Sequence, residues 1–191
     1  MDMTSFFLYC MIATFTPGPT NILILSTATN AGAKKAMKFS YGSAIGFCLL
    51  LVLSAAMNTM LMTVLPKILV FMQITGSLYM VYLAYRMIKK NTSQAAVNQE
   101  ATFRSGFVLQ FLNPKTVLFA LTVIPTFIMP YASGIPMVTV YIAGITLIGF
   151  SAFITWVVFG AVFKEFLHKH QTAANLIMAL FLAYAAIMIW E

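Results

Sequence analysis

The sequence FFLYCMIATFTPGPTNILILS, residues 6–26, decides the fold. Its 21 residues are apolar enough and long enough to cross the roughly 30 Å hydrocarbon core of a bilayer as a helix. Its middle holds Pro17 and Pro19 around Gly18, and each proline lacks a backbone N–H and clashes with the preceding turn. The stretch therefore predicts a membrane helix that is opened at its centre. Asp2 is the only charged side chain before it, so the basic start of a cleaved signal peptide is missing.

The composition extends this interpretation to the whole chain. Of the 191 residues, 61% are apolar and only 8% are charged, whereas a soluble domain carries about a quarter charged residues. This excludes an ordinary cytosolic enzyme, a disordered chain and a secreted disulfide scaffold, and it predicts an integral membrane protein. Cys10 and Cys48 both lie in apolar runs and are expected to be free thiols that pack as small hydrophobic residues. No spacing of ligand residues predicts a metal site or another cofactor.

Six apolar runs are each long enough to span the membrane. They show no alternation of period two, and a single span can satisfy its own backbone groups in lipid only as a helix. The fold class predicted is an all-α integral membrane protein with six transmembrane helices. The predicted spans are residues 6–26, 39–64, 68–88, 106–129, 137–163 and 172–190.

The distribution of Lys and Arg predicts the orientation. With six spans, the loops after the first, third and fifth share one side of the membrane. Nine of the eleven cations fall there, against Lys67 alone on the other side and Lys115 within a span. Basic loops face the cytoplasm, so both termini are expected outside it. The charge of +7 is thus a topology signal and does not indicate a nucleic-acid partner. The nine cations are Lys34, Lys35, Lys38, Arg86, Lys89, Lys90, Arg104, Lys164 and Lys169.

The two halves of the chain resemble each other weakly. They are residues 1–88 and 106–191, separated by a polar cytoplasmic linker at 89–105, and together they form one transporter domain. Because three is odd, the second three-helix copy must be inverted in the membrane. Inverted repeats with broken helices at matching positions are typical of transporters with a substrate site near the midplane. The matched segments are Leu83-Ala84-Tyr85 with Leu182-Ala183-Tyr184, Gly46-Phe47 with Gly149-Phe150, and Pro17-Gly18-Pro19 with Asn113-Pro114.

The two proline breaks supply the candidate binding residues. A broken helix frees carbonyl groups before the break, which suit an ammonium, and N–H groups after it, which suit an anion. Such a site fits a zwitterion such as an amino acid. The alternative is a purely structural kink that neighbouring helices satisfy. The candidate substrate-binding residues are Thr16, Pro17, Gly18, Pro19, Thr20, Asn21, Gln110, Asn113, Pro114 and Lys115.

Lys115 is the only charged residue deep inside a predicted span. A buried ammonium is costly, so it must face the interior of the bundle. It is a candidate for contact with a substrate carboxylate and for proton coupling, and the alternative is a structural lysine bonded to the carbonyls that the first break frees. No Asp or Glu lies within a span, which argues against a dibasic substrate. No catalytic residues are predicted.

Several motifs resemble those of a known family. TPGPTNIL at residues 16–23, GSAIG at 42–46, GSLYMVYLA at 76–84 and FLNPK at 111–115 look like the signatures of the LysE/RhtB amino-acid exporters. The resemblance covers essentially the whole chain and implies export from the cytoplasm. Asn21, together with STAT at 26–29 and TFIMP at 126–130, looks closest to the branch that exports cysteine and O-acetylserine. Neighbouring branches export homoserine, threonine, leucine or arginine. Many members carry an acid at the place of Asn21.

The sequence therefore predicts a multi-pass protein of the bacterial inner membrane that exports a small neutral amino acid or derivative by secondary transport. Cysteine or O-acetylserine, and then threonine, homoserine or leucine, are the candidate substrates. One half is expected to move against the other in alternating access. The lipid bilayer and the substrate are the predicted partners, and a homo-oligomer is a candidate assembly. The alternatives are a non-transporting accessory subunit and, with less support, an intramembrane enzyme.

Overall fold

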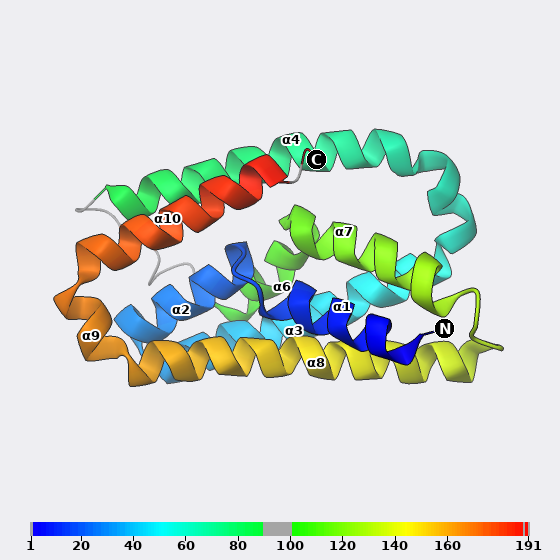
Figure 1. The fold of residues 1–191 in the computed structure, drawn as a ribbon, viewed down its shortest axis with the longest axis horizontal. Helices are drawn as coiled ribbons and strands as arrows, with labels where there is room; N and C mark the ends of the chain where they lie inside the picture. The colour runs from blue at the N-terminus through cyan, green and yellow to red at the C-terminus, as the bar shows by residue number, and fades with distance from the viewer. Residues whose placement is uncertain (1, 90–100, 189, 191) are drawn as a thin grey trace.

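The structure is a computed structural model. It describes residues 2–89, 101–188 and 190, with side chains except at 58–69, 71, 72 and 188. All regular elements in this part of the chain are helices, which confirms the predicted all-α class. They form an elongated bundle in which α4 and α10 lie side by side above the other helices (Figure 1). The predicted linker falls mainly on 90–100, outside the described residues.

The first apolar run is two helices, as its prolines predict. Helix α1 spans Met3–Phe15, α2 spans Pro19–Ala31, and the two are bent by 49°. Pro19 takes the first position of α2, where its missing N–H costs nothing. Asp2 caps α1 by accepting hydrogen bonds from the hydroxyl of Ser5 and from the backbone N–H groups of Thr4 and Ser5, and these bonds hold the pKa of its carboxyl below the usual value.

The fourth run is broken in the same way. Helix α6 spans Phe103–Leu112 and α7 spans Pro114–Val123, which continues into the π-helical turn η1 at Ile124–Ile128. The two parts are bent by 64°. Asn113 caps α7, because its side-chain oxygen accepts a hydrogen bond from the backbone N–H of Lys115. Both proline breaks expected from the sequence are therefore confirmed.

The turn between the second and third runs lies elsewhere than predicted. Helix α3 spans Ala33–Ala56 and α4 spans Asn58–Ile88, so the turn is at Met57 and not near 65–67. Lys67 consequently lies within a helix. At 1.5 Å per residue, the 31 residues of α4 extend about 46 Å, which exceeds the roughly 30 Å hydrocarbon core. Because the helix is longer than the hydrocarbon core, it can include Pro66 and Lys67 without making its membrane-spanning segment longer.

The last two runs agree with prediction to within two residues. Helix α8 spans Ile135–Val162, the short α9 spans Lys164–Lys169, and α10 spans Gln171–Met188. Among the described residues, α3 and α8 are each long and apolar enough to cross a membrane, and the two bent pairs raise the number of candidate spans to four. The apolar part of α10 is shorter, so a total of six spans stays a prediction.

Glycines bring α3 and α6 into backbone contact. A Cβ at Gly42 would lie 1.9 Å from the carbonyl oxygen of Phe103, and one at Gly46 would lie 2.6 Å from that of Phe107. Any side chain larger than hydrogen at either position would force the two helices apart. The GSAIG motif of the sequence thus allows α3 and α6 to pack closely within the bundle.

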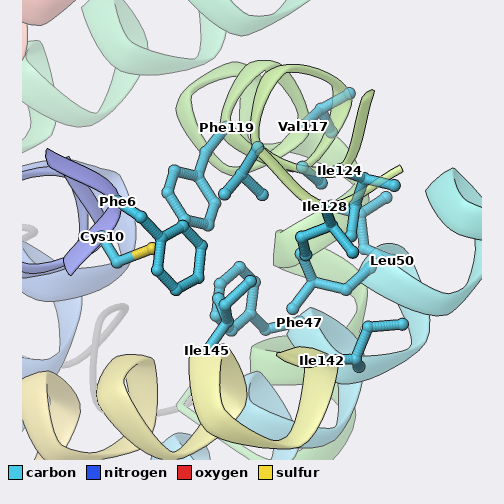
Figure 2. Close-up of a cluster of buried hydrophobic side chains, with 13 residues drawn as sticks. Phe6, Cys10, Phe47, Leu50, Val117, Phe119, Ile124, Ile128, Ile142 and Ile145 are labelled. Carbon is cyan, nitrogen blue, oxygen red and sulfur yellow. The ribbon is translucent and has the colours of Figure 1, made fainter. Parts of the chain in front are cut away.

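The two sequence halves interleave in space. Helix α4, from the first half, makes its most extensive contacts with α10 from the second, while α3 packs on α6 and α8. The largest apolar cluster joins α1, α3, α7, η1 and α8 around rings such as Phe6, Phe47 and Phe119 (Figure 2). Cys10 is a buried free thiol in this cluster. The core is therefore built by both halves together.

Candidate functional site

The two helix breaks meet inside the bundle. Lys115, in the first turn of α7, donates from Nζ to the carbonyl oxygen of Thr16 at 2.7 Å and to its hydroxyl Oγ1 at 2.9 Å. Asn113 donates from Nδ2 to Oγ1 of Thr20 at 3.0 Å. Residues almost a hundred positions apart in the chain are thus joined by side-chain hydrogen bonds at the point where both helices open.

The carbonyl groups that the first break frees already have partners. Asn21 donates from Nδ2 to the carbonyl oxygens of Thr14 and Thr16, both at 2.9 Å. Trp156 of α8 donates from Nε1 to the carbonyl oxygen of Phe15 at 3.2 Å. The negative end of the α1 dipole also attracts a cation at this point. The carboxyl end of α1 therefore acts as the counter-charge of the Lys115 ammonium, with no carboxylate in the spans.

A second set of hydrogen bonds surrounds a buried amide. Gln110 is completely buried, and it donates from Nε2 to Oγ1 of Thr20 at 3.2 Å and to the carbonyl oxygen of Gly106 at 3.3 Å. Its Oε1 accepts from the hydroxyl of Thr116 at 3.3 Å. Since a buried amide without partners would cost free energy, these bonds fix the orientation of Gln110. They also make Thr20 a shared acceptor for two amide side chains.

A cavity of about 40 Å³ with both polar and apolar walls lies between the two breaks, and it is large enough for a few water molecules. Asn21 is 4% exposed, and its Oδ1 has no hydrogen-bond partner among the described residues. A buried acceptor left without a donor is costly, so this atom is ready to receive an N–H or O–H group. The cavity, called here the central cavity, is lined by Ala13, Thr14, Gly18, Thr20, Asn21, Phe47, Gln110, Asn113, Lys115, Thr116, Phe119, Gly149 and Phe153.

A larger cavity adjoins the central one. Its volume is about 390 Å³, and it lies between α1, α7, α4 and α10. Ala13, Lys115 and Phe119 line both cavities. The α1–α7 cavity, as it is called here, is lined by Tyr9, Ala13, Thr16, Pro17, Met80, Lys115, Leu118, Phe119, Thr122, Tyr184 and Ala185.

The comparison with known proteins decides the family. The model of the LysE type translocator matches residues 11–190. The chain belongs to the LysE family. This confirms the resemblance carried by the motifs at 16–23 and 111–115. Because the LysE family consists of translocators and the helices are strongly apolar, the protein is a membrane-embedded transporter and not an enzyme.

Three curated relatives of this LysE family member share one name. Cysteine/O-acetylserine efflux proteins of Escherichia coli (strain K12), Shigella sonnei (strain Ss046) and Shigella flexneri are each 28% identical to this chain over 189 residues. The similarity covers 98% of this chain and 97% of each relative. No solved structure matches the chain.

Six of the ten residues predicted for the site of this LysE family member line the central cavity, namely Gly18, Thr20, Asn21, Gln110, Asn113 and Lys115. Thr16 and Pro17 face the α1–α7 cavity instead. Pro19 and Pro114 line neither cavity: each begins a helix, and the ring of Pro114 packs against Gly76 of α4. The prolines therefore position the site, and the polar residues beside them form its wall.

Sequence reasoning missed the apolar side of the site. Phe47, Phe119, Gly149 and Phe153 also line the central cavity. A Cβ at Gly149 would lie 2.6 Å from the ring of Phe47, so the missing side chain makes room for that ring. The Gly46-Phe47 and Gly149-Phe150 match between the halves was the signal that could have pointed to Phe47 and Gly149.

Proposed function

We propose that this LysE family member is a secondary transporter that exports a small neutral amino acid, or a close derivative, across the bacterial inner membrane by alternating access. The observation that carries the proposal is the meeting of two broken helices at one polar cavity. The name of the relatives adds efflux and makes cysteine and O-acetylserine the first candidate substrates. Threonine, homoserine and leucine are the others.

The cavity offers a place for each charge of a zwitterion. Helices α2 and α7 both begin beside it, and the amino end of a helix favours an anion. We assign the substrate carboxylate to this region, next to the ammonium of Lys115. The free Oδ1 of Asn21 is the acceptor assigned to the substrate ammonium. The proposed binding segment is completed by Thr16, Thr20, Gln110, Asn113, Gly18 and the three prolines.

The remaining walls favour a small neutral side chain. Phe47, Phe119 and Phe153 provide apolar surface, and no acid lies in the described spans to receive a second cation. A dibasic amino acid would bring an unpaired charge into this environment, at a cost of several kcal/mol. A short neutral side chain avoids that cost.

The placement of the basic residues supports export from the cytoplasm. The end of α2, the end of α4 and α9 gather at the same end of the bundle (Figure 1). Lys34 and Lys35 follow α2, Arg86 lies in the last turn of α4, and Lys164 and Lys169 bound α9. We infer from the positive-inside rule that this end faces the cytoplasm and that both termini lie outside. The halves 1–88 and 106–191 would then be inverted repeats.

The packing suggests which parts move. A rigid movement of one sequence half against the other would separate α3 from α6 and α4 from α10, which are the most extensive helix contacts in the bundle. We therefore propose that alternating access moves helix groups drawn from both halves. Lys115 remains the candidate for any proton coupling, and a homo-oligomer remains a candidate assembly.

Counterflow in liposomes tests the proposal. Purified protein is reconstituted with an internal amino acid, and entry of labelled cysteine, O-acetylserine, threonine, homoserine, leucine or lysine is measured. We expect flux of one or more neutral compounds and little flux of lysine. Lys115→Met should abolish the flux while the protein stays folded and inserted, whereas Lys164→Met in the exposed α9 should not affect it.

Three results would contradict the proposal. Absence of flux for every neutral compound would argue against amino-acid transport. Faster entry of lysine than of the neutral amino acids would overturn the argument from the missing acids. Full activity of Lys115→Met would remove Lys115 from the substrate site.

A further inference from the structure

Three cavities follow one another along the bundle. The third has a volume of about 50 Å³, and we call it the α2–α6 cavity after the helices that contribute most of its wall. The α1–α7 cavity is bordered by the helices on the other side of the two breaks. Since each bent pair contributes one helix to each cavity, the central cavity lies between the two. The α2–α6 cavity is lined by Leu23, Thr27, Phe39, Tyr79, Ala101, Ser105 and Leu109.

The barrier toward the α2–α6 cavity is thick. Gln110 and Asn113 both donate to Thr20, and these three polar side chains are all buried. Leu109, which directly precedes Gln110 in α6, is 4% exposed and adds an apolar layer to this barrier. Opening this side requires several hydrogen bonds to break and a core residue to move.

The barrier toward the α1–α7 cavity is much thinner. It consists of side chains that line both cavities, chiefly Lys115 and Phe119. The ring of Phe119 stacks on Tyr9 with centroids 5.5 Å apart, so it is held in place from α1. At the break itself, the Lys115 ammonium joins α7 to the carboxyl end of α1 through its contact with Thr16, while Tyr9 and Thr122 are hydrogen-bonded farther along the same two helices.

The Lys115 contact can be exchanged for a better one. An ammonium has three N–H groups, and the contacts within the described residues use two of them, both on Thr16. A carboxylate is a stronger acceptor than a neutral carbonyl or hydroxyl oxygen, because both partners of the new bond are charged. The Lys115 side chain also lies directly over Gly18, where a Cβ would come within 2.9 Å of its Cδ. Because Gly18 has no side chain, the Lys115 side chain has room to lie across the break.

We propose that the Lys115–Thr16 contact is the gate between the central cavity and the α1–α7 cavity, and that the carboxylate of a bound amino acid opens it. The carboxylate attracts the ammonium away from the carboxyl end of α1, which removes the hydrogen bonds that join Lys115 of α7 to Thr16 at the break. A ligand without a carboxylate leaves the link intact. This inference rests on the proposed function, since it assigns the opening signal to the substrate, but the gate itself can be tested without any transport.

Cysteine accessibility tests the gate. The two native thiols are removed by Cys10→Ala and Cys48→Ala, and a reporter thiol is placed in the central cavity by Thr116→Cys. A membrane-impermeant methanethiosulfonate reagent is then added from the side of the α1–α7 cavity. Thr122→Cys, which lies in the α1–α7 cavity itself, is the matched control reporter.

We expect the Thr116→Cys reporter to react slowly without substrate and at least about tenfold faster with O-acetylserine, as for the loss of one charge-assisted hydrogen bond. Lys115→Met should make it react fast with or without substrate. The methyl ester of the same amino acid, which has no carboxylate, should not accelerate the reaction. The Thr122→Cys control should react equally fast in every condition.

Slow labelling of Thr116→Cys in the Lys115→Met background would overturn the gate. Equal acceleration by the amino acid and its methyl ester would overturn the role of the carboxylate. If Lys115→Met does not fold, Thr16→Val, which removes Oγ1 but keeps the carbonyl, should give an intermediate rate, and an unchanged rate would count against the gate. Fast labelling of Lys115→Met, together with no flux of any amino acid through the parent protein, would retain the gate and reject the transport proposal. Flux through the parent protein, together with slow labelling of Lys115→Met, would do the reverse.

Discussion

Replacing Gly76 with alanine tests how α4 is seated on the second helix break. A Cβ at this position would lie 2.2 Å from Cγ of Pro114 and 2.5 Å from its Cδ. Ordinary van der Waals contact begins at 3.4 Å, so the two groups must separate by about 1.2 Å. Neither partner is a flexible side chain, because one is a proline ring in the first turn of α7 and the other is fixed to the α4 backbone. The helices themselves must therefore move.

The expected cost follows from this displacement. Overpacking of a well-packed contact costs about 1–3 kcal/mol. Alanine in place of glycine inside a helix returns roughly 0.5–1 kcal/mol. A net loss of about 1–2 kcal/mol corresponds to a fall of roughly 2–8 °C in the unfolding midpoint for a chain of this length. Flux should fall as well, because Pro114 is adjacent to Asn113 and Lys115 at the central cavity.

Gly144→Ala is the matched control, since a Cβ there meets no atom within 4 Å. Both variants are measured in the same detergent by thermal unfolding and in liposomes by counterflow. We expect Gly144→Ala to unfold at the same temperature as the parent or slightly higher. Pro114→Ala should relieve part of the defect of Gly76→Ala, seen as a non-additive double variant. Equal midpoints for Gly76→Ala and Gly144→Ala would refute the reasoning.

Three other substitutions test the site in separate ways. Thr20→Val removes the acceptor of two buried amide groups, so the free energy of unfolding should fall by about 1–3 kcal/mol in a thermal unfolding measurement. Thr20→Ser keeps a hydroxyl and should largely avoid this loss. A valine variant as stable as the parent would contradict the role of Thr20 as a shared acceptor. Trp156→Phe leaves the carbonyl of Phe15 without its donor and should cost roughly 0.5–1.5 kcal/mol in the same measurement, whereas no change would indicate that the bond contributes nothing. Gly149→Ala should push the ring of Phe47 into the central cavity, so half-maximal flux should need more substrate, with a larger effect for O-acetylserine than for cysteine; an equal effect on both would argue against a size limit set by this wall.

The sequence predicted the breaks well because their cause is local. Pro17, Pro19 and Pro114 each lack an N–H, and that property does not depend on the surroundings. The polar residues next to the breaks were predicted to bind the substrate, and that role stays a prediction. Five of them, together with Gly18, line one cavity in the structure. The local signals therefore placed most of the polar wall.

What depends on contacts between distant segments could not be predicted. Phe119 and Phe153 belong to the site only because their helices pack into the bundle, and neither residue differs in kind from the other apolar residues of its helix. The turn at Met57 was displaced from prediction because Pro66 and Lys67 resemble a loop, although a helix longer than the membrane core can contain them. The partners of the α1 carbonyls, among them Trp156, likewise come from elsewhere in the chain.

The interleaving of the halves has a consequence for biosynthesis. Met80, Leu83 and Met87 of α4 are buried against Ala179, Leu182 and Ala186 of α10, which is synthesised after the other described helices. Until α10 is synthesised, this face of α4 contacts lipid. This contact costs little free energy, because lipid tails are as apolar as the face of α10 that later replaces them. The packing of α4 is thus completed only after α10 has been synthesised. A nascent chain truncated before α10 would stay inserted but unfinished, with the face of α4 open to whichever neighbouring helix reaches it first.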